Sequence, residues 1–221
     1  MDTSAQSVVV LSLHNAVGVF QGKEKELGRL DAAAGDGDHG ATMVRGLAAA
    51  SAAIDSLAAS LVETGGDCPP GELLIAAGDA FADAAGGASG ALFGALLATV
   101  GRKLPETGIS PAVVSAALQA GAATVAKLGK AAPGDKTMLD ALAPFAAEFA
   151  AAVEQGTDTA AAWHRALPAA ASGAAATADM VAKRGRASRL GERSLGHVDP
   201  GAQSVVYLLG TFDAVLQAHC G

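Results

Sequence analysis

Apolar residues recur along most of this chain three or four positions apart, which is the spacing of an amphipathic helix. The first such segment, residues 4–21, carries Val8 to Phe20 at this spacing and has Ser4 as a candidate N-cap. In no stretch do β-branched residues alternate with polar ones over enough length to predict a strand. The pattern predicts helices over residues 4–21, 24–31, 42–61, 72–84, 91–103, 112–128, 138–155, 157–183 (with a kink or early break at Pro168) and 202–218. We therefore expect one domain, residues 1–221, folded as an all-α bundle of about eight helices.

The composition adds that these helices pack closely. Hydrophobic residues make up 51% of the chain, and aromatic residues only 4%. Much of the apolar share is alanine, which has the highest helix propensity and lets helix axes approach one another. The chain has no run of about 18 uncharged apolar residues that would predict a membrane span. Residues 1–6 also lack the basic region of a signal peptide. We therefore expect no membrane association.

Charge and cysteine content narrow the possible partners and the setting. The formal net charge is −7 and no long block of lysine and arginine occurs, so nucleic-acid binding is not expected. Cys68, in a predicted loop, and Cys220, near the C-terminus, match neither a metal pair nor a disulfide framework. A reduced, cytoplasmic setting is the expectation that follows.

The most unusual stretch is residues 31–46, where Asp31, Asp36 and Asp38 fall within eight residues and alternate with glycines. Two carboxylates about 4 Å apart repel by roughly 1 kcal/mol in water, and by about 4 kcal/mol at an effective dielectric constant near 20. Glycines let the backbone turn tightly around a small ligand that would relieve this repulsion. Oxygen ligands on a flexible loop suit Mg²⁺ or Ca²⁺ better than zinc. A solvated acidic turn between two helices is the alternative.

Three better-known motifs match this chain only in part. Gly35-x-Gly37-x-x-Gly40 has the spacing of a dinucleotide-binding turn, but the preceding segment is not strand-like and two intervening positions are aspartates. A calcium-binding EF-hand loop starting at Asp36 would need glutamate where Leu47 stands. Residues 129–137 resemble a P-loop, but an aspartate is inserted before the lysine and the lead-in is helical. We reject all three.

Other loops of the chain have features of a phosphate site. Residues 39–42 and 87–90 open predicted helices, whose N-terminal N–H groups attract anions. Ser89 is either an ordinary helix cap or a donor to phosphate. Met138 is either a core residue or part of an adenine pocket, because its flexible side chain adapts to flat rings. The predicted loop 184–201, with Lys183 before it, is rich in arginine, which suits either phosphate binding or a solvated surface.

Four motifs occur in order along the chain. They are Asp31-x₄-Asp36-Gly-Asp-His-Gly40, Gly86-Gly-Ala-Ser-Gly90, Pro133-Gly-Asp-Lys-Thr-Met138 and Gly185-Arg-Ala-Ser-x-Leu-Gly-Glu-Arg-Ser-x-Gly-His-x-Asp-Pro-Gly201. Together they resemble the nucleotide-binding L subunit of dihydroxyacetone kinase, which is also the C-terminal domain of single-chain ATP-dependent kinases. The resemblance implies a barrel of eight antiparallel helices that holds ADP or ATP in loops at one end.

The resemblance also implies roles for individual residues. Asp31, Asp36 and Asp38 would bind two Mg²⁺ ions that bridge the nucleotide phosphates, and Arg186 would stabilise charge on the transferring phosphoryl group. The residues expected around the nucleotide are His39, Gly40, Thr42, Ala88, Ser89, Gly129, Thr137, Met138, Gly185, Arg186, Asp199 and Pro200. Such a set can be sufficient, because phosphoryl transfer needs mainly positioning and charge neutralisation from the protein.

The same resemblance places the sugar on another chain. In the family, a K subunit holds dihydroxyacetone covalently on its own histidine. The phosphoryl donor is either exchangeable ATP or a bound ADP that a phosphotransferase-system protein rephosphorylates from phosphoenolpyruvate; an L chain standing alone favours the latter. Another small ketose or tetrose is an alternative substrate. Two other classes remain open: an apolar-ligand-binding bundle with few large side chains at its centre, and a regulatory protein that contacts a transcription regulator, as L subunits do.

Overall fold

A computed structural model describes residues 4–33, 35–64 and 68–220 of the chain. Within these ranges the fold has eight α-helices, two 3₁₀ segments and no strand, which confirms the all-α prediction. The α-helices are α1 (Ala5–Ala32), α2 (His39–Thr64), α3 (Pro70–Ala85), α4 (Gly87–Lys103), α5 (Pro111–Gly129), α6 (Leu139–Glu154), α7 (Thr159–Ala176) and α8 (Pro200–Cys220). The 3₁₀ segments, η1 (Thr177–Asp179) and η2 (Arg186–Ser194), both lie between α7 and α8.

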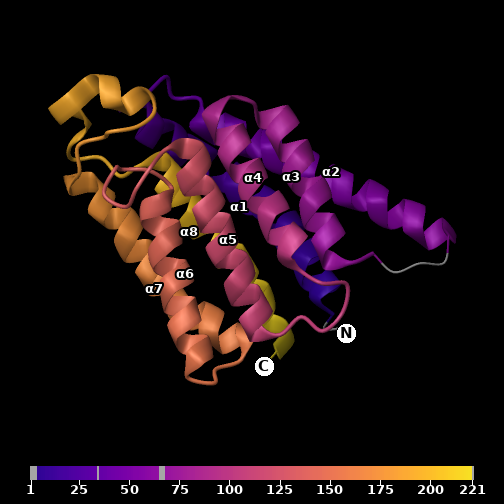
Figure 1. Ribbon diagram of the computed structural model, residues 1–221. Coiled ribbons are helices and arrows are strands. Elements are labelled where there is room, and N and C mark those ends of the chain that lie inside the picture. Colours follow the sequence, from indigo (N-terminus) through magenta and orange to yellow (C-terminus); the bar gives the residue numbers. More distant parts are fainter. Residues whose placement is uncertain (1–3, 34, 65–67, 221) are drawn as a thin grey trace.

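The helices form a closed antiparallel barrel (Figure 1). Each helix packs against its neighbours in the chain, and α8 returns to pack against α1. Because successive helices run in opposite directions, the connections α1–α2, α3–α4, α5–α6 and α7–α8 gather at one end, which we call the loop end. The chain termini lie at the opposite end, while the second half of α2 projects beyond the barrel.

Two predicted helix boundaries are wrong. α1 runs without interruption through Gly22, where the sequence suggested a break between two helices. One glycine costs a helix only about 1 kcal/mol relative to alanine, and the buried face of α1 continues beyond it to Leu27. The second error is the end of α7, which passes through Pro168 but stops at Ala176 rather than at 183. The chain there tightens into the 3₁₀ turn η1, in which the Met180 N–H donates to the Thr177 carbonyl at 3.2 Å, and a buried lysine ammonium donates to the same oxygen.

Small residues bring α3 and α4 into close contact, as the alanine-rich composition suggested. A Cβ atom built on Gly78 would lie 2.5 Å from the carbonyl oxygen of Gly94. Further along the same two helices, a Cβ on Gly101 would lie 2.5 Å from the carbonyl oxygen of Gly71. The two helix backbones therefore touch at both points. This contact fixes where α4 begins at the loop end.

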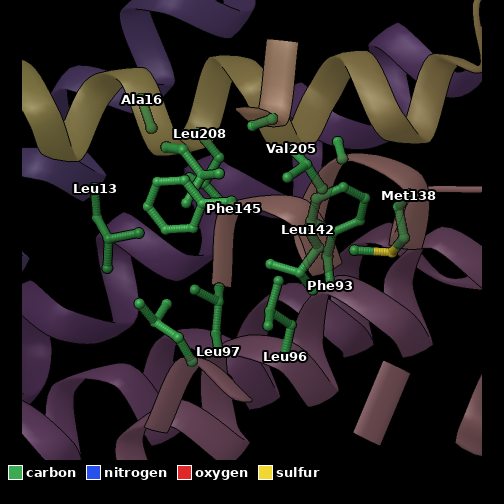
Figure 2. Close-up of a cluster of buried hydrophobic side chains, with 14 of the residues drawn as sticks. Leu13, Ala16, Phe93, Leu96, Leu97, Met138, Leu142, Phe145, Val205 and Leu208 are labelled. Carbon is green, nitrogen blue, oxygen red and sulfur yellow. The ribbon is translucent and has the colours of Figure 1, made fainter. Parts of the chain in front are cut away.

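Large apolar side chains from several helices fill the centre of the barrel (Figure 2). Leu13 of α1, Phe93 of α4, Phe145 of α6 and Leu208 of α8 point toward one another in this cluster. The hypothesis of an apolar-ligand-binding bundle assumed that few large side chains were available to fill this space, whereas these large side chains occupy it.

Among the described helices, α5 alone is long and apolar enough by composition to cross a membrane. In the barrel, α5 packs between α4 and α6.

Candidate functional site

A cavity of about 570 Å³ opens at the loop end of the barrel, a volume typical of small-molecule sites. Its wall draws on all four connections at that end. The predicted site residues in its lining are Asp31, Asp38, His39, Thr42, Ala88, Ser89, Gly129, Thr137, Met138, Gly185, Arg186, Asp199 and Pro200. Folding thus brings together residues that are up to 169 positions apart in the chain, from Asp31 to Pro200.

Asp31, Asp36 and Asp38 converge at one side of the cavity mouth. Each offers a carboxylate oxygen, and these oxygens lie within 4.8 Å of one another. Asp31 is half-buried at the end of α1, and the other two are exposed on the loop. The donor set is therefore all oxygen and open to solvent, which fits Mg²⁺, an ion that keeps several waters when it binds protein carboxylates.

The glycines of this loop have a steric role. A Cβ on Gly35 would lie 2.5 Å from the Asp31 carboxylate oxygen Oδ1, so a side chain there would displace this carboxylate. Gly37 has a φ of 80°, in the left-handed region that favours glycine. The backbone N–H of His39 donates to Asp31 Oδ2 at 3.3 Å. The loop therefore holds its carboxylates by short-range contacts.

Gly40, predicted as a nucleotide contact, lies outside the cavity lining. A Cβ on this residue would lie 2.0 Å from the carbonyl oxygen of Glu24 in α1. Gly40 is therefore the point at which the first turn of α2 crosses α1. Helix packing therefore explains the glycine at this position of the motif. By letting α2 pack closely on α1, Gly40 positions the acidic loop between the two helices.

His39 is buried beneath the cavity and links three helices. Its Nε2 atom lies 2.9 Å from Ser204 Oγ of α8, and its Nδ1 atom lies 3.2 Å from Ser89 Oγ of α4. Burial lowers the pKa of the imidazole, although Asp31 acts in the opposite direction. The lowered pKa favours the neutral ring.

Ser89 is not the N-cap of α4. Gly86 is the N-cap and Ser89 lies in the first turn, so the helix-cap interpretation of Ser89 is wrong.

The other side of the cavity is apolar. Leu92 and Phe93 of α4, Val125 and Leu128 of α5, and Met138 line it. Met138 is 4% exposed and also belongs to the central core, so both of its proposed roles are compatible with its position. An apolar lining beside a polar mouth suits a purine base attached to phosphates.

The α5–α6 connection is held by a carboxylate that the sequence did not single out. Asp140, buried in the first turn of α6, accepts from the N–H of Gly134 at 2.5 Å and from the N–H of Thr137 at 2.7 Å. This arrangement fixes the backbone that presents Thr137 and Met138 to the cavity. The acceptor is three residues after Thr137, which is a local spacing that a turn motif search could have found.

Residues 177–199, which we call the arm, extend from the end of α7 to the start of α8 and close the cavity on one side. Residues 177–183 of the arm were predicted as helix and residues 184–199 as loop; the arm contains both 3₁₀ segments, η1 and η2. At its neck the N–H of Asp199 donates to Thr177 Oγ1 at 2.8 Å. Asp199 Oδ2 accepts from the N–H of Ala202 at 2.7 Å, which caps α8. Burial raises the pKa of the Asp199 carboxyl to about 7.

The arm also reaches across the cavity mouth. The guanidinium of Arg186 forms an ion pair with Asp36 and lies 4.0 Å from Asp38. Arg186 is thus within reach of both the acidic loop and the space between the loop and η2. A positive group at this place can stabilise negative charge on a ligand that also contacts a cation held by the aspartates.

Arg45 is a cavity residue that sequence reasoning missed. Its Nε atom donates to the carbonyl of Ala84 at 2.8 Å, and one of its terminal nitrogens donates to the carbonyl of Ala85 at 3.0 Å. Arg45 therefore binds the end of α3 and holds the glycine turn that starts α4. Both acceptors are backbone carbonyls about 40 positions away. Every residue has such a carbonyl, so the sequence does not indicate which ones a side chain will bind.

Comparison with known proteins identifies the family of this chain. Residues 33–214 match the family model of the DAK2 domain. The D-erythrulose kinase of Mycolicibacterium smegmatis is 48% identical over 183 residues, which are 82% of this chain and 30% of that kinase. The L-erythrulose kinase of Pectobacterium atrosepticum is 40% identical over 216 residues, 97% of this chain and 36% of that kinase. The chain therefore spans about a third of the length of these two relatives.

One relative has a similar length. DhaL, the ADP-binding subunit of the PEP-dependent dihydroxyacetone kinase of Escherichia coli, is 36% identical over 192 residues, 86% of this chain and 88% of the subunit. Among solved structures, the dihydroxyacetone kinase of C. freundii in complex with AMP-PNP and Mg²⁺ matches with a TM-score of 0.70 and 26% identity. The match covers 97% of this chain and 35% of that one. The helical fold expected from the resemblance is therefore confirmed.

Proposed function

Because this chain belongs to the DAK2-domain family, we propose that residues 1–221 form one domain that holds a Mg-nucleotide for a small-ketose kinase. In this proposal the terminal phosphoryl group passes to a ketose held by a separate K-type partner. The observation that carries it is a single cavity with an acidic trio on one side, an arginine over its mouth and an apolar face behind. A cytoplasmic setting is part of the proposal.

Each part of the cavity has a proposed task. Asp31, Asp36 and Asp38 would hold Mg²⁺, as a pair of ions by family resemblance, and the metal would neutralise charge on the phosphate oxygens. Ser89, in the first turn of α4, would donate to a phosphate, since helix N-termini attract anions. Met138 would contact the base. Arg186 would stabilise charge on the transferring group, which is the role that arginine has in many phosphoryl-transfer enzymes.

The substrate and the donor are the finer points of the proposal. The identities of 48% and 40% to erythrulose kinases support a four-carbon ketose, with dihydroxyacetone as the alternative. The E. coli relative supports a bound ADP that is rephosphorylated through a phosphoenolpyruvate-fed phosphotransferase-system protein. Exchangeable ATP is the competing donor.

The decisive experiment combines the chain with a K subunit, erythrulose or dihydroxyacetone, and either ATP or a phosphoenolpyruvate relay. Phosphate transfer that requires the relay supports the coenzyme mode, and transfer with free ATP alone overturns it. The ratio of kcat/KM for the two sugars decides the substrate. Absence of transfer in all four combinations would contradict the kinase assignment.

The metal assignment has its own test in Asp36→Ala. We expect wild-type protein to bind ADP or ATP only when Mg²⁺ is present, and the variant to lose at least about 100-fold in affinity, because a ligand carboxylate is removed. Calorimetric titration with and without Mg²⁺ measures both. Asp55→Ala is the matched control, since Asp55 is also an exposed aspartate but pairs with His14 at 2.9 Å, away from the cavity lining. Equal affinities for the two variants would refute the assignment.

A further inference from the structure

Lys136 stands in the motif that resembles a P-loop, where a lysine would contact phosphate, yet its ammonium group is engaged elsewhere. Its Nζ atom donates to the carbonyl oxygens of Thr177 at 2.7 Å, Ser194 at 2.7 Å and His197 at 2.6 Å. An ammonium has three hydrogens, so these three bonds use all of them. The acceptors come from the beginning and the end of the arm.

The side chain is enclosed by these contacts. Lys136 is 4% exposed, and burial lowers the pKa of its ammonium, while Asp199 and Asp179 act in the opposite direction. Hydrogen bonds to a charged donor contribute more than neutral ones. A side chain of the same length without the charge would remove the Lys136 donor from all three carbonyls, of which, among the described residues, only that of Thr177 has a second donor, the Met180 N–H at 3.2 Å.

The backbone of Lys136 is also specialised. Its φ is 63°, in the left-handed region that residues with a side chain rarely adopt. The next two residues, Thr137 and Met138, line the cavity. One residue therefore joins the α5–α6 connection, which presents the predicted base contact, to the arm, which carries Arg186.

Further ties lie beside it: the backbone N–H of Lys183 donates to the carbonyl of Asp135 at 3.1 Å, and Lys183 Nζ donates to the carbonyl of Gly134 at 3.1 Å. The neighbouring Asp135 carboxylate pairs with Arg184 at 3.1 Å and Lys183 at 3.4 Å, but both of those basic side chains are exposed. These ties all involve residues 183 and 184, whereas the buried Lys136 ammonium binds residues at both the beginning and the end of the arm.

We propose that Lys136 is a positioning residue for phosphoryl transfer, which holds the arm by three backbone carbonyls so that Arg186 stands over the nucleotide. The proposal rests on the proposed function for its effect on catalysis. It assigns the lysine of this motif to the arm rather than to a phosphate group. Its loss should loosen the arm and lower kcat while nucleotide affinity is largely kept.

The test compares Lys136→Met with Lys130→Met. Lys130 is a fair control because it is an exposed lysine at the end of α5, also with a left-handed φ, of 49°. Hydrogen–deuterium exchange of arm peptides, without nucleotide, is expected to be about 10-fold faster in Lys136→Met and unchanged in Lys130→Met. With a K subunit present, kcat should fall by about 100-fold, as expected when a transition-state arginine is misplaced. The KM for the Mg-nucleotide should change less than about 3-fold.

Two further variants guard against a folding defect. Lys136→Arg keeps the charge and offers several donors, so it should restore part of the arm protection and part of kcat. Ser194→Ala removes a hydroxyl that joins Ala182 to Gly191 within the arm, at 2.9 Å and 2.7 Å, and leaves Lys136 intact. This change should raise arm exchange and lower kcat in the same sense.

Two outcomes overturn the proposal. Unchanged arm exchange in Lys136→Met would show that the ammonium does not hold the arm. A large rise in KM with normal arm exchange would make Lys136 a phosphate ligand instead. Should the wild-type chain transfer no phosphoryl group, the proposed function fails, and the exchange comparison, which needs no nucleotide, still decides whether Lys136 secures the arm.

Discussion

The acidic loop and the arm face each other across the cavity mouth, and they are held in different ways. The loop is positioned by residues close to it in sequence: the His39 N–H donates to Asp31, and the Thr42 N–H donates to the Asp38 carbonyl. The arm is held by residues far from it, since Lys136 reaches carbonyls 41 to 61 positions away. The acidic half of the site is therefore built locally, and the arginine half depends on the finished fold.

This difference determines how each half should respond to mutation. A change in the loop acts on the ligand oxygens directly, or on the helix crossing beneath them. A change in the arm acts through its attachments and should alter catalysis more than binding. The following predictions test the contrast.

The largest effect is expected at Arg186, the point where the two halves meet. Arg186→Ala should lower kcat by about 100- to 1,000-fold, because the transferring phosphoryl group loses its positive partner. Single-turnover measurements with a K subunit separate this chemical step from nucleotide binding. Arg189→Ala is the control, because Arg189 is another exposed arginine of η2. Equal losses in the two variants would mean that only the general charge of the arm matters.

The next largest effect tests the seating of the acidic loop. Gly40→Ala places a Cβ where the carbonyl oxygen of Glu24 lies, so α1 and α2 must separate. We expect a loss of roughly 2–3 kcal/mol in the free energy of unfolding, together with weaker Mg²⁺-dependent nucleotide binding. Urea unfolding and calorimetry measure the two effects.

Gly22→Ala in α1 is the control for this change. Outside its own helix, no heavy atom of the described residues lies within 4 Å of a Cβ built there. Replacing an exposed helical glycine by alanine should stabilise the protein by about 0.5–1 kcal/mol. Destabilisation of similar size by both substitutions would contradict the role of Gly40 as a crossing point.

The last prediction concerns pH and the base of the arm. The pKa of Asp199 is raised to about 7 by burial, with Asp140 acting in the same direction and Lys136 opposing. An unfolded aspartate has a pKa near 3.9, so the folded state binds this proton more tightly between those values. Its contribution to stability is therefore full at low pH and is lost as pH rises from about 4 to about 7, with an upper slope of about 1.4 kcal/mol per unit.

Asp199→Asn isolates this contribution, since asparagine can still cap α8. The difference in unfolding free energy, wild type minus variant, should decrease across this pH range in urea titrations. Parallel stability curves for the two proteins would show that the Asp199 carboxyl is ionised in the folded state throughout.

Most helices could be predicted from the sequence, because apolar spacing and alanine content act over single turns. Errors arose at one helix end and at one helical glycine. α7 gives way after Ala176 to the 3₁₀ turn η1, whose Thr177 carbonyl also accepts from the distant Lys136, and α1 continues through Gly22 because its buried face extends on both sides. The predicted break at 65–71 lies partly outside the described residues. The side chain of Cys220 also lies outside them. Cys68 is buried, which raises the pKa of its thiol.

The candidate site divides in the same way. Asp31, Asp36 and Asp38 could be recognised as one group because eight residues of backbone hold them together. The holding roles of Arg45 and Lys136 could not be recognised, since their partners are main-chain carbonyls. Asp140 was missed for a different reason, since its bonds to the N–H groups of Gly134 and Thr137 are local and a search for turn motifs could have found them.

By itself, the sequence determined the helical class, the grouping of three aspartates in one acidic loop, and the family resemblance carried by four motifs. These depend on helix period, local charge repulsion and the short reach of glycine turns. The tertiary structure alone decided that Gly40 seats a helix crossing, that His39 bonds to Ser89 and Ser204, and that Lys136 serves the arm. A buried polar group must find a partner wherever the fold supplies one, and that partner is set by closure of the barrel.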